Sequence, residues 1–139
     1  MAGLRQALYE ALAYDAPLTA LGFGEDRVIT QHDKDTQPTE GSFIVLRLLA
    51  TTPAPFKNSP TNQRQIQIWV HDRASDFGLI DSAIERIKDI MKLLENSETS
   101  DEKWIQDVRW QGDSDDFRDD EARTINRYCQ WLITGSAAT

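Results

Sequence analysis

The stretch QIQIWVHDRASDFGLIDSAIERIKDIMKLLE, which runs from Gln65 to Glu95, decides the fold. Its first seven residues alternate between apolar and polar or mixed side chains, which is the period-two pattern of a half-buried strand. Beyond Asp76 the period changes, and apolar side chains follow the i, i+3, i+4, i+7 spacing of an amphipathic helix. These side chains are Leu79, Ile80, Ala83, Ile84, Ile87, Ile90, Met91 and Leu94. We therefore expect a strand that leads directly into the longest helix of the protein.

Segments before this stretch also have recognisable periods. Leucine and alanine residues recur at helical spacing from Gly3 to about Ala13, and the short helix that they predict should end before Pro17. A short strand is expected at Arg27–Thr30. Phe43–Ala50 is almost continuously apolar, which is typical of a central strand covered on both faces.

Two more strands are expected after the long helix. Trp104–Gln111 places Trp104, Val108 and Trp110 on one face, and Ala122–Ile133 places Ile125, Cys129, Trp131 and Ile133 on one face. Residues 135–139 are expected to form a frayed tail. We treat residues 1–139 as a single domain of the α+β class, with an antiparallel sheet of about four main strands packed by the long helix and the short N-terminal helix.

The segment between the two central strands is rich in proline. Thr51–Asn62 holds three prolines, so it should not continue the sheet ladder, and the expected structure is an antiparallel hairpin with an unusually long loop. Two interpretations stay open. Phe56 could fold back from a flexible tip onto its own domain, or the tip could be an arm that orders on a neighbouring chain. In the second case the candidate contacts are Pro53, Pro55, Phe56, Lys57 and Asn58.

The composition limits the classes of function. The chain carries 15 basic and 23 acidic residues, and its net charge of −8 argues against a face that attracts nucleic acid by general electrostatics. A single cysteine cannot form an internal disulfide, which fits a reduced, cytoplasmic origin. The sequence shows neither the apolar core of a signal peptide nor an apolar run long enough to cross a bilayer, so we expect no membrane partner.

Candidate catalytic and metal-binding groups do not form a known motif. The acidic run Asp113–Glu121 fails the calcium-loop pattern, because Phe117 and Arg118 occupy positions that need a ligand and a glycine. His32 and His71 show no spacing that would bring them together with a third ligand. Cys129 sits on an apolar strand face without a local activating motif. We therefore expect no enzymatic activity, no metal and no cofactor.

The order of elements and several local stretches resemble the tail terminator (tail completion) proteins of long-tailed bacteriophages. The resemblance covers most of the chain, although none of its motifs is a catalytic signature. The stretches that carry it are Leu4–Leu12, Phe43–Arg47, Ile68–Asp72, Asp76–Asp81, Trp110–Asp116, Asp119–Glu121 and Arg123–Tyr128.

The resemblance implies a structural protein that acts by assembly. Proteins of this family form a hexameric ring that caps the tail tube, stops its polymerisation and offers a surface to the head. The implied partners are further copies of the chain, the major tail tube protein and a head-side connector or stopper protein, with DNA only as passing cargo. The implied location is the tail neck of the virion, and the bacterial cytoplasm during assembly.

Charge adds a physical expectation to this resemblance. Six copies at −8 each would carry −48, and a negative lumen would repel passing DNA instead of trapping it. We expect either the loop Gln31–Glu40 or part of the acidic run to face such a lumen; the candidates in the run are Asp113, Asp115, Asp116, Asp119 and Asp120. The alternatives are another neck component, such as a head–tail joining or stopper protein, and a cytoplasmic protein-interaction domain unrelated to phage.

Overall fold

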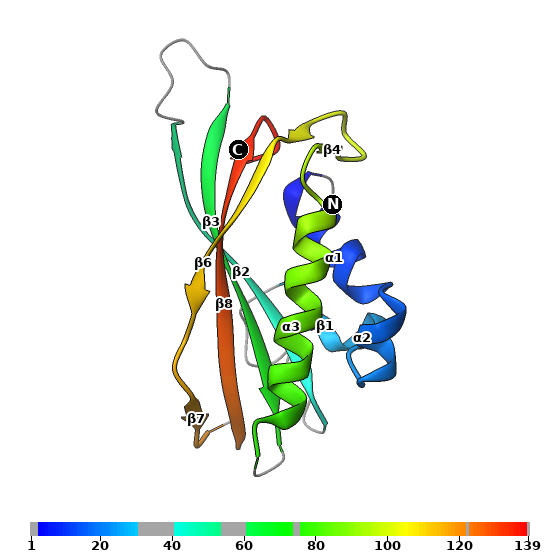
Figure 1. Ribbon diagram of the computed structural model, residues 1–139, viewed down its shortest axis with the longest axis vertical. Helices are drawn as coiled ribbons and strands as arrows, with labels where there is room; N and C mark the ends of the chain where they lie inside the picture. Colours follow the sequence, from blue (N-terminus) through cyan, green and yellow to red (C-terminus); the bar gives the residue numbers. More distant parts are fainter. Residues whose placement is uncertain (1–2, 31–40, 54–60, 74–75, 122, 139) are drawn as a thin grey trace.

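The computed structural model describes residues 3–30, 41–53, 61–73, 76–121 and 123–138. It has a helical layer packed on a long, twisted sheet (Figure 1). The order of elements confirms the α+β class. In chain order the elements are α1 (Leu4–Ala13), α2 (Ala16–Ala20), the 3₁₀ turn η1 (Glu25–Arg27), β1 (Val28–Ile29), β2 (Phe43–Pro53), β3 (Asn62–Asp72), α3 (Gly78–Leu93), β4 (Ser97–Glu98), β5 (Trp104–Ile105), β6 (Asp107–Asp113), β7 (Phe117–Asp119) and β8 (Thr124–Gly135).

The main sheet is built around β3. Its strand order is β1-β2-β3-β8-β6, and β7 pairs with the other end of β8. β3 pairs antiparallel with β2 on one side and with β8 along its whole length on the other. The four main strands β2, β3, β8 and β6 pair antiparallel as expected, and the two-residue strand β1 adds a parallel pair at the edge beside β2. β4 and β5 form a separate two-stranded sheet.

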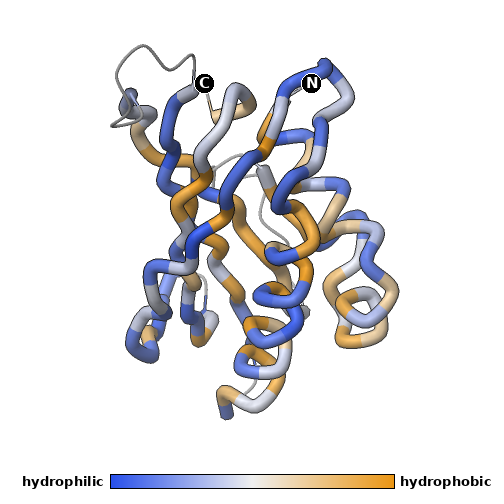
Figure 2. Tube along the Cα trace, turned by 45° about the horizontal axis from the view of Figure 1, so that its top comes forward, coloured by the Kyte–Doolittle hydropathy of each residue, from blue (hydrophilic) through white to orange (hydrophobic). Residues whose placement is uncertain are grey.

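The core lies between one face of the sheet and the helices α1 and α3. The hydrophobic stripe of α3 is buried as its spacing predicts, and the alternation along β3 places Ile66, Ile68 and Val70 against it. On β8 the residues Ile125, Cys129, Trp131 and Ile133 are buried in the same core, as expected. Figure 2 shows the hydrophobic residues gathered where the strands meet the helices, with hydrophilic residues outside.

The stretch expected as one strand at Trp104–Gln111 is two. β5 ends at Ile105 and pairs with β4, whereas β6 begins at Asp107 and pairs with β8. Between them the Gln106 N–H donates to the Thr134 carbonyl at 2.9 Å. The break places Trp104 and Trp110 in different sheets, and both remain about half exposed, at 47% and 51%. The prediction that these two tryptophans share one face of a strand was therefore wrong.

The end of the chain also differs from the expectation. Residues 135–138 do not fray, because Ala137 and Ala138 are buried. The Ala137 N–H donates to the Trp104 carbonyl at 3.0 Å, and the Ser136 hydroxyl accepts the Trp104 N–H at 2.8 Å. Small side chains fit this close approach, and the backbone hydrogen bonds fix it. Thr139 lies outside the described residues.

An ion pair ties α2 to α3. The Asp15 carboxylate caps α2 by accepting the Leu18 N–H at 3.1 Å, and it also accepts two hydrogen bonds from the Arg86 guanidinium at 2.8 and 3.0 Å. The hydrogen bonds from Arg86 hold the pKa of Asp15 below its usual value, although burial opposes this shift. Asp15 thus anchors the short second helix against the middle of the long one.

Replacing Gly135 should destabilise the fold more than replacing another glycine of similar backbone conformation. A Cβ at Gly135 would lie 2.2 Å from the Trp104 carbonyl oxygen, and its φ of 151° is unfavourable for other residues. We expect Gly135→Ala to lower the free energy of unfolding by at least about 2 kcal/mol in urea titration. Gly112→Ala is the control, because its φ is 126° but nothing lies within 4 Å, and it should cost only about 1 kcal/mol. Equal losses would contradict the clash.

The Asp15–Arg86 pair predicts a pH-dependent stability. Because the pKa of Asp15 is lower in the folded chain, its stabilising effect is present above about pH 4 and is lost as the pH falls through the folded pKa. Asp15→Asn keeps a capping residue but removes the charge. We expect its melting temperature at pH 7 to fall by roughly 3–6 °C, and the difference from the natural chain to shrink near pH 2.5. Asp26→Asn, on an exposed turn, should show no such convergence.

Candidate assembly surfaces

β2 and β3 form the expected antiparallel hairpin, but its ladder is longer than expected. β2 continues through Thr51 and Thr52 to Pro53, which pairs with Asn62. An irregularity between Leu48 and Thr51 shifts the register. Proline is tolerated there because β1 covers only the first part of β2, so the missing N–H falls on a sheet edge. The expectation that Thr51–Asn62 could not extend the ladder was therefore wrong at its two ends.

Of the residues expected to make assembly contacts, the structure describes only Pro53. Pro53 is exposed at the last position of β2. Pro55, Phe56, Lys57 and Asn58 lie outside the described residues. We call the described segments Arg47–Pro53 of β2 and Asn62–Gln67 of β3 the hairpin base.

The first residue of the acidic run is held against the helical layer. The Asp113 carboxylate lies 2.9 Å from the Lys88 ammonium of α3, and it accepts the Trp110 indole N–H at 3.0 Å. The same ammonium lies over the Trp110 ring, 4.6 Å from the centroid. The hydrogen bond to Asp113 raises the pKa of Lys88. Asp113 is thus part of a compensated cluster and does not stand free as an acidic group.

The rest of the run is more exposed. Asp116 lies 3.5 Å from Arg127, which also pairs with Asp81 of α3. Asp119 accepts the Glu121 N–H at 3.1 Å and closes the turn before β8. Asp115 and Asp120 are exposed. The five acidic candidates therefore differ: Asp113 is paired with α3, Asp116 is exposed but pairs with Arg127, Asp119 is half-buried, and Asp115 and Asp120 are exposed. The second lumen candidate, Gln31–Glu40, lies outside the described residues.

An aromatic cluster on the helix-free face of the sheet was missed by sequence reasoning. Trp69 packs on Tyr128 with ring centroids 4.5 Å apart, and the Phe117 ring lies 6.0 Å from Trp69. Phe117 is 43% exposed. The sequence alone does not indicate this cluster, because Phe117 lies in an acidic run that is expected to connect two strands. In the structure Phe117–Asp119 forms β7 and pairs with β8.

Glutamines join three strands next to this cluster. Gln67 of β3 donates to Gln130 of β8 at 3.1 Å, and Gln130 donates to Gln111 of β6 at 3.2 Å. The Trp69 indole N–H donates to Gln67 at 3.1 Å. Among the described residues no helix covers this face, so its side chains satisfy one another across the strands.

Of the other candidate catalytic residues, Cys129 and His71 are buried in the fold. Cys129 is buried, and this burial raises the pKa of its thiol to about 12, far from the range of a nucleophile at neutral pH. The His71 ring stacks on Phe43 with centroids 4.5 Å apart, and its Nδ1 lies 3.0 Å from the Thr124 hydroxyl. His32 lies outside the described residues.

The described residues offer neither a metal site nor a membrane-spanning helix. Within the described ranges, no group of three or more His, Cys, Asp or Glu side chains is arranged to hold a metal ion. Of the helices in the same ranges, none combines the length and the apolar character needed to cross a bilayer.

Comparison with known proteins shows a similarity of fold. The sequence matches no protein-family model and no curated protein. Among solved structures, the fold is similar to that of a chain in the virion of a native gene transfer agent particle, with a TM-score of 0.65 and 18% sequence identity. The match covers 96% of this chain and 94% of that chain. The shared feature is thus a fold that extends over nearly the whole of both chains.

Removing the Lys88 charge should loosen the β6–β7 connection. Lys88→Met keeps an unbranched stem but leaves Asp113 without its closest cation. We expect faster amide hydrogen exchange at residues 112–116 and a loss of about 1 kcal/mol of stability. Lys92→Met, an exposed position one helical turn further on, is the matched control and should leave this exchange unchanged. The same exchange rates in both variants would show that the Lys88 cluster does not hold the turn.

Proposed function

We propose that this chain is a structural protein of a phage-like virion and that it forms a ring that caps the tail tube and ends its polymerisation. The observation that carries the proposal is the similarity of fold, over nearly the full length of both chains, to a chain of a gene transfer agent virion. The resemblance of several stretches to tail terminators favours the end of the tail over other positions in a virion.

The surfaces of the chain support an assembly role. The exposed base of the hairpin, the helix-free sheet face and the acidic residues near β7 all lie outside the core. In the proposed ring the arm contacts a neighbouring subunit or the tail tube. Asp115, Asp116, Asp119 and Asp120 are the remaining candidates of the acidic run for a lumen that repels DNA, because the charge of Asp113 is compensated by Lys88.

Particle assembly without this protein tests the proposal. Tails made by a producer strain that lacks the gene should be overlong in electron micrographs, because no cap stops tube growth, and the gene supplied in trans should restore the length. Tails of normal length that fail to join heads would instead assign the chain to head–tail joining. Unchanged particles would contradict a role in the virion.

The ring itself is measured separately on the purified protein. A hexamer has a mass of 6 × 15.8 kDa, about 95 kDa, and sedimentation should report this species. A chain that remains monomeric even when tail tube is added would favour a protein-interaction domain over a tail cap.

A further inference from the structure

The charges of the chain are unevenly distributed along the sequence. Residues 41–71, which include all of β2 and all of β3 except its last residue, Asp72, contain no Asp or Glu, so all 23 acidic residues lie elsewhere. The same 31 residues contain Arg47, Lys57 and Arg64. In a chain with a net charge of −8, the hairpin is therefore a positive element.

The base of the hairpin carries this positive charge on both strands, of which β2 forms the edge of the sheet beyond β1. Arg47 is exposed on β2, beyond the two residues that β1 covers. Arg64 of β3 donates to the Leu49 carbonyl at 3.1 Å, and its pKa is lowered first by burial and then by the nearby charge of Arg5. Arg47 and Arg64 thus lie in strand segments, residues 43–53 and 62–71, that hold no carboxylate, and Arg5 of α1 adds a positive charge near Arg64.

A hollow of about 370 Å³ lies elsewhere on the molecule, between α1 and the small β4–β5 sheet. Its lining includes the apolar side chains of Ala7, Ala11, Leu94 and Ile105 and the carboxylates of Glu10 and Glu98. Glu10 and Glu98 are exposed, and Glu95, Asp101 and Glu102 add further exposed carboxylates to the surrounding segment. An apolar floor with an acidic rim matches the long stem and charged head of an arginine or lysine.

The wall of the hollow is a well-formed turn. The Thr99 N–H donates to the Lys103 carbonyl at 2.7 Å, and the Lys103 N–H donates back to the Thr99 hydroxyl at 3.2 Å. The Thr99 hydroxyl also donates to the Asp101 carboxylate. β5 is fixed in turn by the hydrogen bonds between Trp104 and residues 136 and 137. The acidic rim is therefore held by the fold before any partner binds, which lowers the cost of binding.

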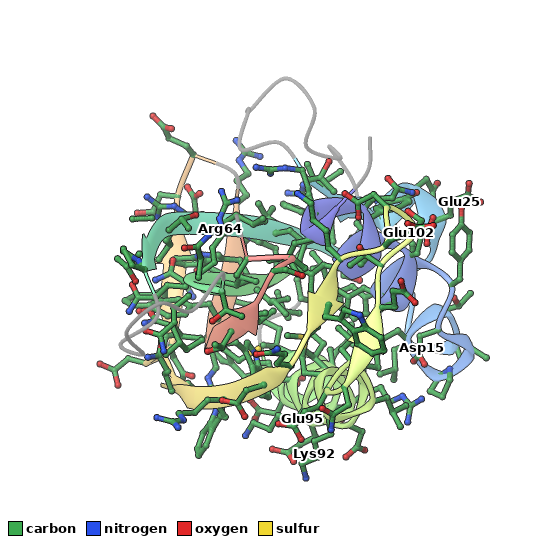
Figure 3. All side chains as sticks on the ribbon, turned by 90° about the horizontal axis from the view of Figure 1, so that it is seen from above. Asp15, Glu25, Arg64, Lys92, Glu95 and Glu102 are labelled. Carbon is green, nitrogen blue, oxygen red and sulfur yellow. The ribbon has the colours of Figure 1, made fainter. Side chains whose placement is uncertain are left out.

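The positive edge and the acidic hollow are displaced sideways from each other at the same end of the molecule. In Figure 1 the ends of β2 and β3 that lead to the arm lie at the upper left, whereas β4 and the N-terminus lie at the upper right. In Figure 3, seen from above, Arg64 and Glu102 are labelled on opposite sides. Copies placed side by side in the same orientation can therefore bring the edge of one to the hollow of the next.

We infer that the hollow between α1 and β4 receives the positive base of the β2–β3 hairpin from a second copy of this chain. The contact joins two different surfaces, so it is head-to-tail, and repeated contacts of this kind close into a ring or continue as a filament. The inference rests on the ring of the proposed function and gives that ring its subunit contact. Complementary charge selects the partner surface, because the hairpin base lacks the carboxylates that would repel the rim.

Charge reversal with rescue tests the contact on the purified full-length chain. Arg47→Glu and Glu98→Arg should each raise the concentration needed for ring formation by on the order of 100-fold in sedimentation, because like charges then meet. The double variant should regain the ring, because the pair is restored with reversed sign. Arg118→Glu on β7 and Asp26→Arg on η1, both exposed and outside both the hairpin base and the lining of the hollow, are matched controls that should leave the ring intact.

Each outcome of this experiment either supports the subunit contact or overturns it. Single variants that keep the ring, or a double variant that stays dissociated, would overturn this contact while the tail-length test of the proposed function stands on its own. Control variants that dissociate equally would show a general effect of charge and would also overturn it. A natural chain that sediments only as a monomer would remove the ring and the contact together.

Discussion

The pairing of β3 with β8 is the interaction on which the rest of the structure depends. It runs from Asn62–Gly135 to Asp72–Ile125 and places β3 between two long antiparallel neighbours. Because the side chains of a strand alternate, this register sends Ile66, Ile68 and Val70 to the helices and leaves glutamines and Trp69 on the other face. The position of α3 follows, since its apolar stripe can be buried only on the first of these faces.

The sequence contained enough information for the elements that repeat a period over many residues. α1, α3 and the long strands β2, β3 and β8 bury the residues that their spacing indicates. The errors fall where a single contact overrides the pattern. The break at Gln106 and the packed end at Ala137 both depend on backbone hydrogen bonds that meet at Trp104 and Thr134, and no local periodicity reports such long-range contacts.

The candidate surfaces were less predictable than the fold, for a related reason. The acidic run lies before β8 as expected, but it is not only a connection, because it begins with the last residue of β6 and contains β7. The partner of Asp113 is a lysine of α3, 25 residues away in sequence. Phe117 joined an aromatic cluster only because β7 folds back on β8 beside Trp69 and Tyr128. The hollow combines α1 with β4 and β5, and such a surface exists only after the chain has folded. The charge segregation of the hairpin, in contrast, is a property of the sequence itself.

This segregation is not explained by the stability of the fold. Both hairpin strands have exposed positions, such as Arg47 and Gln65, where a carboxylate would meet water and cost little. The chain already carries a net charge of −8, and a carboxylate at these exposed positions would break no contact of the described core. A contact between the hairpin and another negative surface would give the absence of acids from residues 41–71 a physical reason. An isolated monomer has no such need, whereas in the proposed ring each hairpin would meet the acidic rim of the next copy.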